Sequence, residues 1–200
     1  MEFGVHRYET CGGAWIGLLR HVWAAGEAGM DDPGPVIEGP PIMFEIASLS
    51  WEDPVLREFG DRRLIARARD REPAPLPAGT GGAHGAGQLR WVVELLRARP
   101  WTTSAWISLT VPGEAMPGVT ALSFRIRGYR LVMTAMFRTL NVSLAYLTCI
   151  PLHAVGVRVA AELGLPPGPL RIFADVPHVE IGDIDRVAEV LAAQPEPHAA

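Results

Sequence analysis

The chain of 200 residues contains no lysine, and all 18 of its basic residues are arginines. This absence excludes Schiff-base chemistry, a pyridoxal phosphate held on a lysine and the lysine of a P-loop. Cysteine is also scarce, since Cys11 and Cys149 lie far apart and in no pattern that resembles a zinc site. The sequence therefore predicts no disulfide framework and no bound metal.

Charge and long apolar runs are also in short supply. The net charge is -4, and charged residues make up 20% of the chain, which is typical of a soluble globular protein without affinity for nucleic acid or anionic membranes. The longest uncharged run, residues 139–157, only just approaches the roughly 20 residues of a membrane span, and Asn141, Pro151 and His153 interrupt it. The N-terminus lacks the basic and then apolar layout of a signal peptide, so we expect a cytoplasmic protein.

Helical and strand periodicities follow one another irregularly along the chain. Apolar residues at helical spacing predict helices over residues 14–25, 87–99, 141–164 and 182–193. Strand patterns cover residues 42–48, 104–111 and 169–181, with a hairpin over 114–143 that turns at Arg127–Gly128. This mixture predicts an α+β fold, a single domain over residues 1–193 with one large mixed sheet covered by helices on one face.

Segments rich in proline and glycine predict the connections. "GMDDPGPVIEGPP", residues 29–41, is typical of a turn-rich connector. We expect residues 70–86, which include "REPAPLPAGTGGAHG", to form a mobile loop, and residues 194–200, "QPEPHAA", to form a disordered tail.

The second half of the chain carries a longer pattern. The segment "FRTLNVSLAYLTCIPLHAVGVRVAAELGLPPGPLRIFADVPHVEIGDID", residues 137–185, resembles the C-terminal half of thymidylate synthases and of the related pyrimidine hydroxymethylases, almost without a gap. Within it, "FRTLN" falls on the family's Gln-Arg-Ser-x-Asp segment, and "VPHVEIGDID" falls on the segment with its sugar-binding histidine. The resemblance implies a thymidylate synthase-like fold over most of the chain.

The resemblance also implies roles for five residues. Arg138 takes the place of an arginine that binds the nucleotide phosphate, and His178 that of a histidine that holds the sugar. Asn141 stands where the family has an aspartate that hydrogen-bonds the folate pterin. Cys149 stands where the family has an asparagine or aspartate that reads the pyrimidine edge, and Glu180 replaces the tyrosine that follows the sugar-binding histidine. We take Arg138, Asn141 and His178 as substrate-binding candidates, with Asn141 also contacting the cofactor. On the residues alone, a structural salt bridge is the favoured role for Arg138, while Asn141 suits a helix cap as well as a ligand contact.

Other family residues are missing. Gly118 falls where the family carries the thiolate that adds to the pyrimidine ring, and glycine cannot do this. The paired arginines that the family sends into its partner's phosphate site would fall near Thr102–Ser104, and its N-terminal arginine loop near the arginine-free "DDPGP". Because a phosphate dianion usually needs several donors, a single Arg138 favours an unphosphorylated substrate.

The catalytic candidates are Glu180, His178 and Cys149. Cys149 on an apolar helix is typical of an inert buried thiol, and as a relocated nucleophile it would need a nearby base, such as His153 one turn later. His178 and Glu180 alternate on a strand and therefore share a face, which suits either an exposed edge pair or an acid/base pair that lines a pocket.

The resemblance implies an enzyme of specialised biosynthesis that transfers a one-carbon unit, as hydroxymethyl or methyl, from 5,10-methylenetetrahydrofolate to a carbon of a nucleoside-like or other electron-rich small molecule. Loss of the thiolate is compatible with an acceptor that is itself nucleophilic, with positioning and acid/base help from Glu180 and His178. Two alternatives stay open: a catalytically inactive subunit or binding module, and a non-folate enzyme that uses Glu180 as general base. The family forms dimers through the face of its sheet, so we expect a homodimer, or a heterodimer with a related subunit.

Overall fold

Three long strands form the centre of the fold, as the sequence predicts. The structure is a computed structural model that describes residues 4–70, 82–110 and 118–194. The predicted hairpin consists of β6 (Val119–Arg127) and β7 (Arg130–Asn141), and Gly128 in its turn has a φ of 59°, which favours glycine. β8 (Pro167–Glu180) lies parallel to β7.

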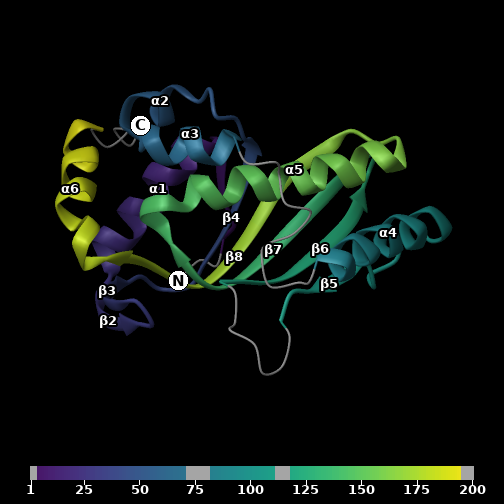
Figure 1. Cartoon of the computed structure of the whole chain (residues 1–200), viewed down its shortest axis with the longest axis horizontal. Helices are drawn as coiled ribbons and strands as arrows, with labels where there is room; N and C mark the ends of the chain where they lie inside the picture. Colours follow the sequence, from purple (N-terminus) through teal and green to yellow (C-terminus); the bar gives the residue numbers. More distant parts are fainter. Residues whose placement is uncertain (1–3, 71–81, 111–117, 195–200) are drawn as a thin grey trace.

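Five shorter strands complete the sheet, which is mixed and eight-stranded (Figure 1). They are β1 (His6–Thr10), β2 (Glu27–Asp31), β3 (Gly34–Glu38), β4 (Ile42–Ser48) and β5 (Trp106–Ser108). The main strand order is β1-β4-β8-β7-β6-β5, and the hairpin of β2 and β3 joins it because β3 pairs with β8. The pairs β1–β4 and β7–β8 are parallel, and the other pairs are antiparallel.

The helices lie against this sheet and against one another. They are α1 (Cys11–Ala25), α2 (Pro54–Phe59), α3 (Arg62–Asp70), α4 (Gly82–Ala98), α5 (Ala145–Leu163) and α6 (Ile184–Ala193), with the short 3-10 helices η1 (Val142–Leu144) and η2 (Ile181–Asp183). α5 lies across β7 and β8 at the centre of the molecule, α1 contacts β1, β4 and β8, and α4 contacts β5 and α5 (Figure 1).

The two faces of the sheet differ in burial. On the face towards the helices, one row of paired residues crosses four strands with no exposed surface: Phe44, Ile172, Ala135 and Leu122. The neighbouring row on the opposite face is only partly buried: Glu45, Arg171, Thr134 and Ser123. The structure therefore confirms an α+β domain with one large mixed sheet, and among the described residues it leaves one face of that sheet open.

The long apolar helix predicted after β7 is confirmed. Gly164 ends α5 in the left-handed conformation, with a φ of 68°. The stretch from Val142 to Leu163 is long and apolar enough to cross a membrane by length and composition, but half of it is buried inside the fold. Its contacts with β7 and β8 account for that apolar character.

The prediction of a connector over residues 29–41 is wrong, because this segment contributes to the hairpin of β2 and β3. Its pairing with β8 joins residues more than a hundred positions apart, which local periodicity does not reveal. The strand β1 and the helices α2 and α3 were also not predicted from the sequence. α4 begins at Gly82, inside the segment predicted as a loop, while residues 71–81 and 195–200 lie outside the described residues.

Candidate functional site

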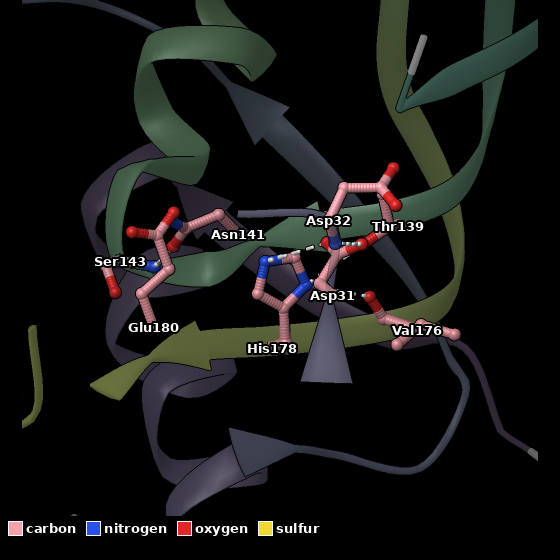
Figure 2. Close-up of polar contacts among 8 residues, drawn as sticks. All are labelled: Asp31, Asp32, Thr139, Asn141, Ser143, Val176, His178 and Glu180. Atoms are coloured by element: carbon pink, nitrogen blue, oxygen red, sulfur yellow. Dashed lines mark hydrogen bonds and ion pairs between the residues drawn. The ribbon is translucent and has the colours of Figure 1, made fainter. Parts of the chain in front are cut away.

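Three of the predicted site residues, Asn141, His178 and Glu180, meet where β7 and β8 end. The two strands are parallel neighbours, and their register pairs Asn141 with His178. Glu180 follows as the last residue of β8, and η1 leads directly from Asn141 into α5. Residues that are far apart in sequence therefore lie side by side at the start of the central helix (Figure 2). We call Asp31, Thr139, Asn141, His178 and Glu180 the β7–β8 site.

Asn141 performs two structural tasks in this site. Its Oδ1 accepts a hydrogen bond from the backbone N–H of Ser143 at 3.0 Å and so caps η1. Its Nδ2 donates to Oε1 of Glu180 at 2.9 Å. The amide group therefore holds the Glu180 carboxylate in place, and one of its two N–H groups remains for a ligand.

His178 is the most deeply buried member of the site, with 4% of its surface exposed. Its Nδ1 lies 3.0 Å from Oγ1 of Thr139 and 3.4 Å from the carbonyl oxygen of Val176. Its Nε2 lies 3.7 Å from a carboxylate oxygen of Asp31. In Figure 2 the ring lies between the Asn141–Glu180 pair and Asp31, and its contacts with Thr139, Val176 and Asp31 fix its orientation.

Asp31 is a member of the site that the sequence reasoning missed. It ends β2 and accepts hydrogen bonds from the backbone N–H of Asp32 at 2.8 Å and from the Thr139 hydroxyl at 3.3 Å. The Asp32 backbone hydrogen bond, followed by the charges of His178 and Arg138, holds the pKa of this carboxyl below its usual value. Asp31 is therefore an anion at neutral pH. The available signal was the "DD" of "DDPGP", noted for its lack of arginine rather than for its acids.

Arg138 lies close enough to Asp31 to lower its pKa. Its backbone N–H donates to the carbonyl oxygen of Gly118 at 2.9 Å, and its side chain is half-buried. The buried Nε of this guanidinium has no hydrogen-bond partner among the described residues. A buried donor without a partner destabilises the fold by about 1–3 kcal/mol, so a ligand that accepts a hydrogen bond from this Nε would be favoured. The Asp31 carboxylate is close enough to oppose an anionic ligand there.

Gly118 leaves no room for a side chain. A Cβ placed there would lie 2.9 Å from the carbonyl oxygen of Thr139, closer than side-chain carbons approach backbone oxygens. The position that the resemblance aligns with the family's thiolate therefore carries no thiol, and the neighbouring backbone leaves no room for one.

Cys149 lies on α5 in the hydrophobic core. Its thiol is 1% exposed, and burial raises its pKa well above the ordinary value. Burial lowers the pKa of His153, while a backbone hydrogen bond with Gly168 acts in the opposite direction. These surroundings disfavour a thiolate, so the chemistry proposed below does not use Cys149.

Within the described part of the chain, no group of three or more His, Cys, Asp or Glu side chains could hold a metal ion. No model of a known protein family matches the sequence, and no curated protein matches it either. What the chain does must therefore be inferred from the site itself and from the pattern of residues 137–185.

Proposed function

We propose that the chain is a thymidylate synthase-like enzyme that transfers a one-carbon unit to a carbon of an unphosphorylated, electron-rich acceptor. The observation that carries the proposal is the meeting of Asn141, His178 and Glu180 at the paired ends of β7 and β8. The resemblance aligns Asn141 and His178 with ligand-binding positions and Glu180 with a tyrosine that follows the sugar-binding histidine, although the three lie on two separate strands. The proposed cellular location of this enzyme is the cytoplasm.

The charges of the site support an acceptor without a phosphate group. Arg138 is the one arginine that the resemblance assigns to phosphate, and Asp31 is close enough to interact with its charge. Glu180 adds a second carboxylate to the same site. A phosphate dianion requires several converging donors, and here it would meet two acids instead. A nucleoside-like, phenolic, enamine or heteroaromatic acceptor avoids this repulsion.

The side chains of the site suit general acid/base chemistry on such an acceptor. Glu180, held by Asn141, would accept the proton that the acceptor loses as its carbon becomes nucleophilic. His178, fixed by Thr139 and Asp31, would orient a hydroxyl or ring nitrogen through Nε2. 5,10-Methylenetetrahydrofolate, when bound, would supply the one-carbon unit, and the remaining N–H of Asn141 is the contact available to its pterin. An electron-rich acceptor makes up for the missing thiolate.

Calorimetry with tetrahydrofolate tests the cofactor. Saturable binding that Asn141→Ala weakens, with Ser108→Ala on β5, two strands away from β7, as an exposed control, supports the proposal. Mass spectrometry of candidate acceptors incubated with methylenetetrahydrofolate tests the transfer, and Glu180→Gln should abolish it without preventing folate binding. Failure to bind any reduced folate would remove this function. The site would then favour a non-folate reaction with Glu180 as base, because most of the Asn141 side chain is already engaged within the protein.

The open face of the sheet has the composition expected of an interface with a partner chain. Met43 and Trp106 on this face are 40% and 42% exposed, beside the partly buried Phe173 and Met136. The same face carries the ion pair of Arg171 and Glu45, with 2.6 Å between Nε and Oε2. A mixed surface of this kind is typical of an interface, so we propose a homodimer, or a heterodimer with a related subunit that would make this chain the non-catalytic member.

Light scattering tests the assembly. Met43→Glu places a charge on the open face and should convert a dimer into a monomer, whereas Met30→Glu on β2, where Met30 is 72% exposed, is the matched control. A wild-type chain that stays monomeric alone, and that also fails to pair with a co-expressed homologue, would contradict the proposed interface.

A further inference from the structure

A second concave region lies between α2 and α3, away from the β7–β8 site. Its volume is about 600 Å³, and none of its lining residues belongs to that site. Ile65 and Ala66 of α3 form an apolar floor, with Leu56 of α2 fully buried beneath them. The exposed Arg57 and Arg62 also line it, and Asp70, the last residue of α3, is the one acidic residue in this lining. We call this hollow the α2–α3 groove.

Positive charge is concentrated around the α2–α3 groove. Four of the nine residues of α3 are arginines, although the whole chain has a net charge of -4. Arg69, also in the lining, is paired with Glu52 at 2.7 Å. The exposed guanidinium groups of Arg57 and Arg62 have no hydrogen-bond or ion-pair partner among the described residues.

Arg62 is also poorly placed for the stability of its own helix. It is the first residue of α3, which has no acidic residue in its first turn. The N-terminal end of a helix carries a partial positive charge, so a cation there is unfavourable by about 0.3–1 kcal/mol. Asp61 caps the helix by accepting hydrogen bonds from the backbone N–H groups of Arg63 and Leu64, but its side chain pairs with Arg186 rather than with Arg62. Helix stability therefore gives no reason for an arginine at this position.

We propose that the α2–α3 groove binds a small amphipathic monoanion. A carboxylate would bridge Arg57 and Arg62, since a guanidinium group binds a carboxylate through two parallel hydrogen bonds. The apolar part of the ligand would lie over Ile65 and Ala66. The volume falls within the range of about 300–1,000 Å³ that is usual for small-molecule sites. Leu56 and Ile65 are buried and do not protrude from the surface, which favours a small ligand that enters the groove rather than contact with a membrane.

Fluorescence titration of the full chain with 8-anilinonaphthalene-1-sulfonate, an anionic aromatic probe, tests this site. We expect saturable binding that decanoate displaces and that decyltrimethylammonium does not. Arg57→Gln combined with Arg62→Gln should weaken probe and decanoate binding at least tenfold. Arg63→Gln, in the same helical turn but outside the groove lining, should change it less than twofold.

A second variant keeps the test decisive if the double variant does not fold. Ala66→Trp fills the floor from an exposed helix position while leaving the arginines intact, and calorimetry should show the same loss of decanoate binding. Equal weakening by Arg63→Gln, or unchanged binding in both groove variants, would overturn the proposal. Sedimentation with phosphatidylglycerol vesicles that depends on Arg63 as much as on Arg62 would also overturn it, in favour of a membrane-facing helix.

Discussion

Asn141→Asp tests the structural logic of the β7–β8 site most directly. The substitution introduces the residue type that the thymidylate synthase family carries at the position that the resemblance aligns with Asn141. It changes one atom of the side chain and preserves Oδ1 as the cap of η1. It also removes the amide N–H that binds Glu180 and places a second carboxylate 2.9 Å from Oε1. We therefore expect the family's own residue to destabilise this protein.

Two contributions set the size of the effect. A hydrogen bond from the amide to a charged carboxylate contributes about 1.5–3 kcal/mol. Two carboxylates at this separation repel by about 1.4 kcal/mol in a medium of dielectric constant 80 and by about 6 kcal/mol at 20. Both side chains are half-buried and will rotate apart, so the lower repulsion applies. We expect Asn141→Asp to lower the free energy of unfolding by about 3–4 kcal/mol at pH 8.

The loss should depend on pH with a defined sign. Two adjacent carboxyl groups retain a shared proton more readily than isolated ones, because the second ionisation creates the repulsion. The folded variant therefore binds a proton that its unfolded chain has already released, and its deficit relative to wild type is complete only at higher pH. Below about pH 3, where both carboxyl groups are largely protonated in the unfolded chain, the deficit should largely disappear.

Urea unfolding followed by tryptophan fluorescence measures this free energy. Trp15 is a suitable reporter, since its indole N–H donates to the carbonyl oxygen of Ser143 and its ring packs edge-on against Tyr146. Glu180→Gln alone should cost less than about 1 kcal/mol. The double variant with Asn141→Asp should recover most of the loss, because the new amide can donate to the new carboxylate. Equal loss with and without Glu180→Gln would refute the proposed contact.

Three further perturbations probe neighbouring parts of the molecule. The pKa of Asp31 is lowered in the folded protein, so the ionised carboxylate stabilises the fold above the pKa that Asp31 has in the unfolded chain, and this stabilisation is lost as pH falls through the folded pKa. Asp31→Asn should remove this part of the acid sensitivity. The free energy of unfolding of the variant should therefore change less between pH 7 and pH 3 than that of the wild type. Gly118→Ala should lower the unfolding free energy by about 1–3 kcal/mol, since its methyl group would meet Thr139, and a neutral result in thermal unfolding would show that β7 can move. Cys149 should resist a thiol reagent such as 5,5′-dithiobis(2-nitrobenzoate) in the native protein and react after unfolding, whereas rapid native labelling would reopen its candidacy as a nucleophile.

The elements that could be predicted from sequence are those whose pattern is local and long. The apolar periodicity of α5 and the turn at Gly128 specify their structures within one continuous segment. The hairpin of β2 and β3 could not be predicted in this way. Its strands are short, and β3 is held by β8 from the other end of the chain. The prolines and glycines of residues 29–41 correctly predict a turn. They give no indication that the residues on either side of the turn form strands, because those strands depend on pairing with β8.

Two of the five residues of the β7–β8 site were missed, one of them because of the same long-range pairing. Asn141, His178 and Glu180 lie on segments with a recognisable pattern, so they could be proposed as a group. Asp31 enters the site only because β3 pairs with β8 and carries its hairpin partner β2 to the ends of the long strands. Thr139 was passed over because a hydroxyl on a strand has no distinctive signature until its partners are known.

The position of Asp31 also bears on the choice between the proposed substrates. If the site had only lost the phosphate-binding arginines, a phosphate ligand would bind weakly but would not be rejected. An ionised carboxylate within the range of Arg138 and 3.7 Å from Nε2 of His178 instead makes an anionic ligand unfavourable at the point where the resemblance would put the phosphate. Asp31→Asn should therefore relax the discrimination between a nucleoside and its monophosphate, while leaving the affinity for the uncharged nucleoside within a few-fold. Equal rejection of the monophosphate by wild type and variant would show that shape, rather than charge, excludes it.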